Sequence, residues 1–193
     1  MTRPGELPSN RSNLVAVLVI GLLGLAGCKT ERPPQESKGG LPGKPLVARA
    51  VIEARSGSSL KGEARFTEID GGVKVEVHVT EAPPGPHAVH IHEKGDCSAP
   101  DAASAGAHFN PDSHPHGAPT AEKHHAGDFG NMDVGANGHG MLELVSKGLT
   151  VKEGPHSVVE RGIIIHEKAD DMTTQPSGNA GGRIGCGVIQ LEK

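Results

Sequence analysis

The chain has 193 residues, a length that fits one folded domain with or without a tail. With three Phe and no Trp or Tyr, any core must be built from Val, Ile, Leu and Ala, while 28 Gly and 15 Pro predict many turns rather than long helices. A formal net charge of −4 and the lack of any basic run in the sequence argue against nucleic acid as a partner.

Residues 1–27 have the pattern of a processing signal. Arg3 and Arg11 precede an apolar stretch from Leu14 to Ala26 that is too short to span a bilayer comfortably. The stretch ends in Leu25-Ala26-Gly27-Cys28, which is similar to a bacterial lipobox. We therefore expect a lipoprotein signal peptide at 1–27, lipidation of Cys28, and a lipid anchor in the bacterial cell envelope, as a periplasmic or outer-membrane lipoprotein. The alternative is an ordinary secretory peptide with a cysteine near its cleavage site.

Residues 28–45 are charged and rich in Pro and Gly, which predicts a flexible tether, so the folded domain is expected at 46–193. If Cys28 carries lipid, Cys97 and Cys186 remain. In an exported protein such a pair most simply forms a disulfide. Metal binding by both thiols is the alternative, although neither cysteine has Cys-x-x-Cys spacing.

A period of two in the hydrophobic pattern predicts short β-strands. The clearest run, from Val73 to Val79, alternates valines with polar residues, as a half-buried strand does. Similar runs predict strands at 46–55, 60–68, 87–93, 140–146, 149–152, 158–166 and 184–191. Eight short strands without a convincing helix indicate an all-β fold, an eight-stranded antiparallel sandwich or barrel. The two long gaps, 94–138 and 167–183, are expected to be functional loops.

Histidines are concentrated around the first long gap. His90 and His92 are separated by one residue, so on a strand both rings point to the same face and can bind one ion. His166, after three isoleucines, can add a ligand from across the sheet. Imidazole suits copper, zinc, iron and nickel. Each histidine alone has a simpler interpretation, as a solvated residue or a hydrogen-bonded core residue, but their joint pattern favours a metal.

The long loop offers a second set of donors: His108, His116, His125 and Asp128. Three imidazoles and one carboxylate can form a closed tetrahedral site of the structural zinc type. Zinc would also order a loop that has little apolar content of its own.

The order of these residues resembles that of the copper/zinc superoxide dismutase family. The resemblance covers residues 46–193 and is carried by His90-Ile91-His92, Gly95–Ser98, Gly106–Pro111, His116-Gly117, His125–Asp128, His166–Asp171, Gly178–Arg183 and Cys186–Ile189. It implies an eight-stranded Greek-key barrel that carries a binuclear site. Copper would be bound by His90, His92, His108 and His166, and zinc by His108, His116, His125 and Asp128, with His108 as the bridge.

The resemblance also implies roles for residues around the metals. Asp170 would hydrogen-bond His90 and His116, Arg183 would guide and hold the anionic substrate, and Cys97 and Cys186 would form the family disulfide. The implied activity is the disproportionation of superoxide to dioxygen and hydrogen peroxide by Cu(II)/Cu(I) cycling. In the family's scheme His108 releases copper and takes up a proton in the first half-reaction. The oligomeric state is expected to be a monomer or a homodimer.

The alternative function is a non-catalytic copper/zinc-binding envelope lipoprotein. Such a protein would be expected to lack a copper ligand, Arg183 or the bridging histidine, and all of them are present. The loop after His166 is several residues shorter than is usual in the family and has no charge between Asp171 and Arg183, which predicts weaker electrostatic attraction of the substrate. Six histidines receive no role: His78, His87, His114, His124, His139 and His156. Of these, His87, His139 and His156 are expected in turns.

Overall fold

The computed structural model describes residues 44–193, so the predicted signal peptide, Cys28 and nearly all of the tether lie outside the described residues. The strands are β1 (Val47–Ala54), β2 (Lys61–Ile69), β3 (Gly72–Thr80), β4 (Gly85–His92), β5 (Asp128–Val134), β6 (Gly140–Ser146), β7 (Gly162–His166), β8 (Arg183–Val188) and β9 (Gln190–Leu191). A single turn of 3-10 helix, η1 (Ala103–Ala105), lies between β4 and β5. No helix in this part of the chain has the length and apolar character that crossing a membrane requires.

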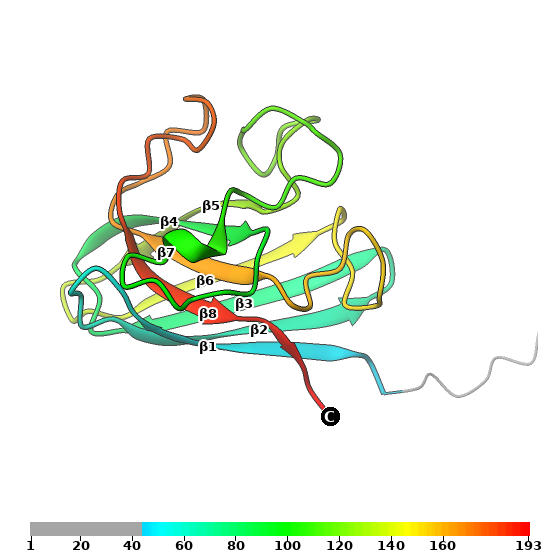
Figure 1. Ribbon diagram of the computed structural model, residues 1–193, viewed down its shortest axis with the longest axis horizontal. Coiled ribbons are helices and arrows are strands. Elements are labelled where there is room, and N and C mark those ends of the chain that lie inside the picture. Colours follow the sequence, from blue (N-terminus) through cyan, green and yellow to red (C-terminus); the bar gives the residue numbers. More distant parts are fainter. Residues whose placement is uncertain (1–43) are drawn as a thin grey trace, which may run out of the picture. The chain divides into compact units, whose positions relative to one another are not determined.

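Eight of the strands close into an antiparallel barrel (Figure 1). Their order is β2-β3-β6-β5-β4-β7-β8-β1, and β1 pairs with β2 from Val47↔Thr67 to Ile52↔Gly62, which completes the ring. The short β9 pairs with β1 near the start of that strand, at Ala48 and Arg49. Because β3 lies beside β6 and β4 beside β7, two connections cross the barrel end, as they do in a Greek key. The predicted all-β, eight-stranded class is confirmed.

The core lies inside this barrel and has the composition that the sequence predicts. Val73, Val75, Val77 and Val79 of β3 are each at most 1% exposed, while the residues between them face outward. The three Phe side chains, Met132 and further Val, Ile, Leu and Ala side chains complete the cluster. At about 25 cal/mol per Å² of apolar surface, this burial is the main stabilising contribution to the fold.

Two strand predictions are wrong. Residues 149–152 form no strand, because the loop there is anchored by Glu68, whose carboxylate accepts hydrogen bonds from the Thr150 hydroxyl and the Val151 N–H. β5 forms inside the segment that we expected to be a loop. Asp128, Phe129 and Gly130 are all buried, so burial alternates only from Gly130 to Val134, and Gly130 has a φ of 77°. The apolar residues of β5 therefore lack the period-two pattern of the other strands.

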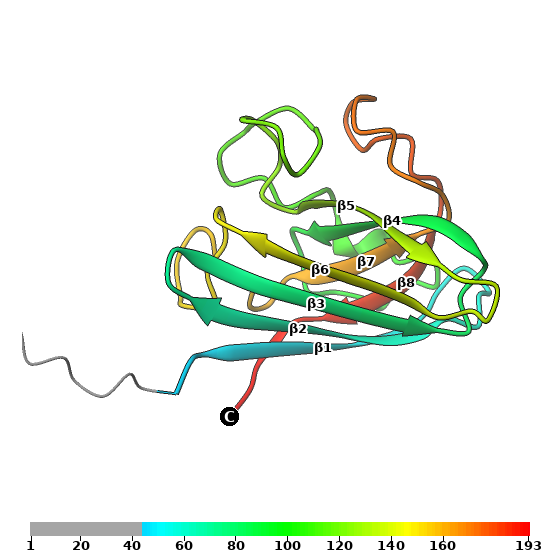
Figure 2. The same ribbon diagram turned by 180° about the vertical axis from the view of Figure 1, so that it is seen from behind.

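The later part of the loop 93–127 and the loop 167–182 project from the same side of the barrel, beside β4, β5 and β7 (Figures 1 and 2). The earlier part of the first loop, with η1, lies along β7 and β8. β4 and β7 are neighbours in the sheet, paired from Val89↔Ile165 to His92↔Gly162. The histidines at the ends of these two strands therefore lie beneath the loops that contain the remaining candidate ligands.

Candidate metal centre

β4 presents His90 and His92, two of its three histidines, away from the core. Val89 and Ile91 belong to the barrel core, so the alternation of the strand places His90 and His92 on the opposite face. His166 ends β7, the strand next to β4. His108, in the long loop, forms an isolated antiparallel bridge with His92, which places it at the same end.

These four residues form what we call the first donor set: His90, His92, His108 and His166. One ligand atom from each lies within 4.8 Å of the others, and all four residues are buried. Their ring centroids are as close as 4.0 Å for His90 and His108. The copper ligands predicted from the sequence are therefore brought together.

The outward nitrogens of these rings have fixed partners, and the inward ones have none. His92 donates from Nδ1 to the Gly106 carbonyl at 2.9 Å, and His90 donates from Nε2 to Asp170 Oδ2 at 2.8 Å. Because carbonyl and carboxylate oxygens accept only, these contacts place the proton on the outer nitrogen. His90 Nδ1 and His92 Nε2 are left as lone pairs that point into the set.

The second donor set comprises His108, His116, His125 and Asp128, and it is equally compact. His108 Nδ1 lies 2.9 Å from Asp128 Oδ1 and 3.3 Å from His125 Nδ1. His116 Nδ1 lies 3.1 Å from the other carboxylate oxygen of Asp128. Ligands around a tetrahedral zinc with bonds of about 2.0 Å are about 3.3 Å apart, so the spacing fits zinc.

Unpartnered buried atoms test whether a metal belongs here. In residues 44–193, the buried side-chain polar atoms without a hydrogen-bond partner are five ring nitrogens: His90 Nδ1, His92 Nε2, His108 Nε2, His116 Nδ1 and His166 Nε2. A fold seldom leaves such groups unsatisfied, and all five belong to the two donor sets. Cations bound at these atoms would satisfy every one of them.

Burial keeps the rings of His92, His108 and His166 in the neutral form that metal binding needs. It lowers the pKa of His92 to about 2 and the pKa of His108 to about 4, with neighbouring imidazoles adding to the effect. Burial alone would raise the pKa of Asp128, but hydrogen bonds from His108 and His125 outweigh it and hold that pKa well below its usual value. Within the second set, Asp128 is therefore a carboxylate and the His108 ring is neutral near neutral pH.

The family model for copper/zinc superoxide dismutase matches residues 60–189. The chain belongs to this family. A solved structure, titled as that of the clock protein EA4, is similar to this chain with a TM-score of 0.69 and 39% sequence identity. The match covers 78% of this chain and 97% of that chain. The two proteins therefore share a fold over nearly the whole described domain.

In this member of the copper/zinc superoxide dismutase family, Asp170 lies between the two donor sets. Its Oδ2 accepts from His90 Nε2 at 2.8 Å and its Oδ1 accepts from His116 Nε2 at 2.9 Å. The Asp170 backbone is held in turn by Asn131 of β5, whose side-chain amide donates to Asp170 O and accepts from Asp170 N. The contacts that the resemblance implies for Asp170 are present, and Asn131 is an addition that the sequence did not reveal.

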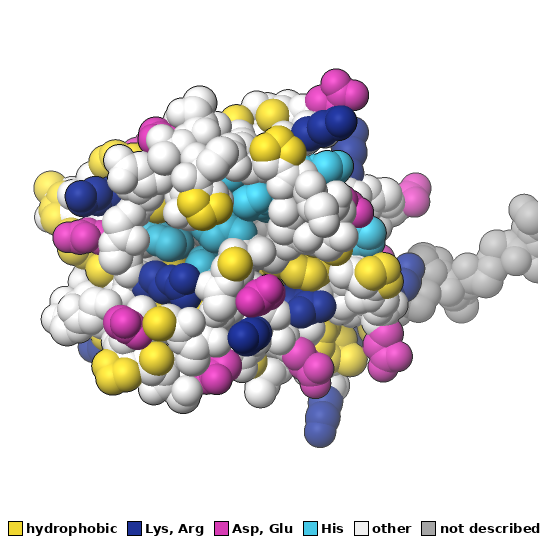
Figure 3. Space-filling view, turned by 45° about the horizontal axis from the view of Figure 1, so that its top comes forward, with side chains coloured by type: hydrophobic (Ala, Val, Ile, Leu, Met, Phe, Trp, Pro, Cys, Tyr) yellow, Lys and Arg dark blue, Asp and Glu magenta, His cyan; other side chains and the backbone are white. Residues whose placement is uncertain are grey.

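Arg183 stands at the rim of a pocket of about 630 Å³ that opens onto both donor sets. Figure 3 shows histidine side chains gathered in a hollow on this face, with a basic side chain beside them. The Arg183 guanidinium donates from Nη1 to Ala102 O at 2.7 Å and from Nη2 to Gly106 O at 2.8 Å. Because Gly106 O also accepts from His92, one carbonyl fixes Arg183 relative to the first donor set.

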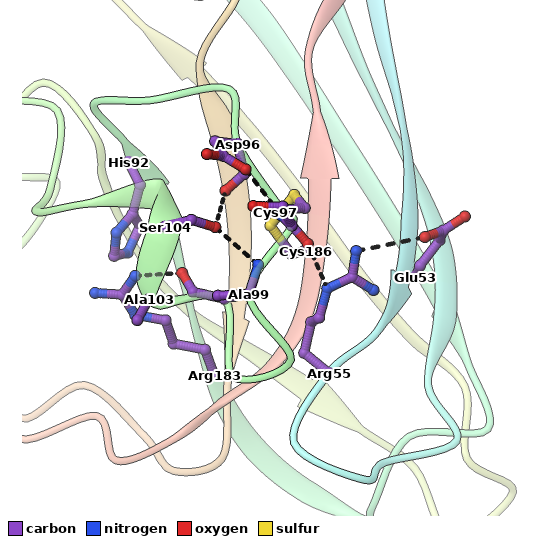
Figure 4. Close-up of a disulfide and its surroundings, with 12 residues drawn as sticks. Glu53, Arg55, His92, Asp96, Cys97, Ala99, Ala103, Ser104, Arg183 and Cys186 are labelled. Carbon is purple, nitrogen blue, oxygen red and sulfur yellow. Dashed lines mark hydrogen bonds and ion pairs between the residues drawn. A yellow bond between two sulfur atoms is a disulfide. The ribbon is translucent and has the colours of Figure 1, made fainter.

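The disulfide supports the segment that supplies these carbonyls. Cys97 and Cys186 are bonded, with Cα atoms 5.8 Å apart, which confirms the predicted pair. Figure 4 shows η1 between the disulfide on one side and Arg183 and His92 on the other. Ala102 and Ala105 pack with Cys186 on Ile164 of β7. The disulfide and this small cluster therefore hold the loop that positions Arg183.

The expected position of His87 in a turn is wrong. It lies on β4, is 2% exposed, and has its two ring nitrogens 2.7 Å from the carbonyl oxygens of His166 and Pro83. His87 thus links β4 to a member of the first donor set. Among the other histidines without a predicted role, His78 and His139 are exposed, and His156 contacts Asp112 at 3.1 Å.

Proposed function

We propose that this chain is a copper/zinc superoxide dismutase, with copper in the first donor set and zinc in the second. The observation that carries the proposal is the position of one ring. His108 offers Nε2 to the first set and Nδ1 to the second. Nε2 is buried without a hydrogen-bond partner, and Nδ1 lies 2.9 Å from Asp128 Oδ1. A single imidazole shared in this way suits two cations of different kinds.

Copper, when bound, supplies a one-electron couple between Cu(II) and Cu(I), and zinc has no redox role. The overall reaction converts two superoxide anions and two protons into one dioxygen and one hydrogen peroxide. The protein must therefore hold an anion near the first donor set and deliver protons to it.

His108 is the residue suited to carry a proton. Its Nε2 faces the first set and the pocket, while Nδ1 stays fixed against Asp128 in the second set. A ring anchored through one nitrogen can take up and release a proton at the other without moving away.

Arg183 supplies the positive charge that attracts and orients the anion. Two of its five N–H donors are occupied by Ala102 and Gly106, so the others remain for a ligand in the pocket. No other lysine or arginine lines this pocket within the described chain, although Glu93 does. Attraction of superoxide therefore depends on Arg183, against a chain of net charge −4.

The test is superoxide dismutation by the purified full-length chain as its metals are removed and returned. The proposal expects about one copper and one zinc per chain, with activity that disappears on copper removal and returns with copper. Activity that stays absent after copper loading would support the alternative, a non-catalytic copper/zinc-binding protein. Manganese or iron contamination is excluded by measuring the metal content of each sample.

We also propose that the protein acts in a bacterial cell envelope, tethered through lipid on Cys28. The support is the sequence pattern before Cys28 together with the disulfide, since disulfides persist mainly in exported proteins. Cys28→Ser should move the protein from the membrane fraction to the soluble fraction. Retention of the variant on the membrane would contradict the anchor, and it would leave the dismutase proposal intact.

A further inference from the structure

The backbone of His116 depends on one side chain from the other long loop. Gln175, in the loop 167–182, accepts from His116 N through Oε1 at 2.9 Å and donates from Nε2 to His116 O at 2.9 Å. The amide thus pairs with both polar groups of one residue, as a neighbouring β-strand would. His116 is 4% exposed and belongs to the second donor set.

The Gln175 amide supplies the hydrogen bonds of both backbone groups of His116. Among residues 44–193, His116 N and His116 O make no other hydrogen bond. A buried backbone N–H or C=O without a hydrogen-bond partner destabilises the fold, and without Gln175 only water could bond to these two groups. The next residue is held in another way, since Gly117 N donates to Asp128 Oδ2.

The loop around Gln175 is built by its own contacts. The Asp171 carboxylate accepts from Thr173 N at 3.0 Å, from Thr174 N at 2.8 Å and from the Thr174 hydroxyl at 2.6 Å. Asp171 N donates to Gly178 O, and Gly178 N donates to Thr174 O, which closes the segment. Gln175 therefore extends from a folded turn, although the residue as a whole is exposed.

The same turn brings Asp170 against the His116 ring. A Cβ on Gly178 would lie 1.8 Å from Asp170 Oδ1 and 2.6 Å from His116 Nε2, so the absence of a side chain allows this approach. Asp170 holds the ring of His116 through Nε2, and Gln175 holds its backbone. Together they leave Nδ1 aimed at Asp128.

We propose that Gln175 is a positioning residue for His116, and that it sets how long zinc stays in the second donor set. The inference rests on the proposed function, because it takes zinc to occupy that set. It assigns a purpose to the short 167–182 loop, which has no charges between Asp171 and Arg183 to attract substrate. In this chain the loop holds a ligand of the zinc site instead.

The experiment measures zinc release from the fully loaded full-length chain to a chromogenic chelator. Gln175→Ala removes both hydrogen bonds to His116 and should release zinc at least about fivefold faster, which is the change expected for the loss of a single net hydrogen bond. Gln175→Glu keeps an acceptor for His116 N–H but cannot donate to His116 O at neutral pH, so its rate should be intermediate. Gln190→Ala, which truncates an exposed glutamine on β9, is the matched control and should release zinc at the wild-type rate.

Two further measurements separate positioning from general loosening. Copper release should stay within twofold of wild type in Gln175→Ala, and Co(II) placed in the zinc site should show shifted visible bands. Equal acceleration of both metals, or zinc release within twofold of wild type, would overturn the inference. If Gln175→Ala fails to fold, the Gln175→Glu rate and its Co(II) bands decide the matter. A wild-type chain that binds no zinc would overturn the proposed metal assignment and this inference together, and zinc analysis of the wild type identifies that case.

Discussion

Asp170 is the residue whose replacement tests the coupling of the two donor sets most sharply. Its side chain is fully buried, and its two oxygens accept one hydrogen bond each from His90 and His116 at 2.8 and 2.9 Å. Asp170→Asn keeps the size and shape of the side chain. It replaces one accepting oxygen by an NH₂ group, which faces an imidazole N–H that can only donate.

One of the two rings must then lose its partner or move its proton. A buried donor left unsatisfied costs about 1–3 kcal/mol, and a proton shifted to the inner nitrogen blocks that nitrogen from a metal. With about 2 kcal/mol lost from one site, we expect the affinity of that site for its metal to fall about 30-fold. This value lies within the 10–100-fold range that is typical when a hydrogen-bond partner of a ligand is removed.

The assay is competition with chelators of known affinity, measured separately for copper and zinc. Asp133→Asn, at an exposed position of β5, is the matched control and should leave both affinities unchanged within twofold. If Asp170→Asn also binds both metals within twofold of wild type, the hydrogen bonds of Asp170 do not orient the ligands, and the reasoning is refuted.

Three more predictions concern charge, the disulfide and the pocket. The unfolded pKa of histidine, near 6.5, exceeds the folded values of about 2 for His92 and about 4 for His108, so below pH 6.5 the unfolded chain binds protons that the folded chain does not. The free energy of unfolding of the metal-free protein should therefore be highest above pH 6.5 and fall by on the order of 2 kcal/mol per ring at pH 5. Equal midpoints of urea unfolding at pH 7.5 and pH 5 would contradict this. Reduction of Cys97–Cys186, separated by 89 residues, should destabilise the domain by about 4–5 kcal/mol in denaturant unfolding, and an unchanged midpoint would show that the loop is held without the bond. Arg183→Ala should lower the rate per copper at least about tenfold and flatten its dependence on salt, and loss of copper would show instead that the guanidinium holds the loop at Gly106.

Most of the fold and the members of both donor sets could be predicted from the sequence. Alternating valines mark β3, and the single residue between His90 and His92 places both rings on one face of β4. β5 is not evident from the sequence, because its apolar residues Phe129, Met132 and Val134 do not alternate along the whole strand and Gly130 interrupts them.

Contacts that depend on the folded loops were beyond the sequence. The nitrogen that each ring turns inward is set by a distant acceptor, such as the Gly106 carbonyl for His92. Asn131 and Gln175 each pair with the backbone of a residue about 40 or more positions away, and nothing in their local sequence marks them. His87 follows Gly85 and Pro86, which are common in turns, yet in this fold those two residues begin β4.

The central claim is that His108 joins a copper ion and a zinc ion through opposite nitrogens. The most direct measurement is anomalous diffraction at the copper and zinc edges from crystals of the metal-loaded chain. The account predicts copper beside the unpartnered nitrogens of His90, His92 and His166, zinc beside Asp128, and the His108 ring between them. A single ion, or zinc in both positions of a chain supplied with copper, would contradict it.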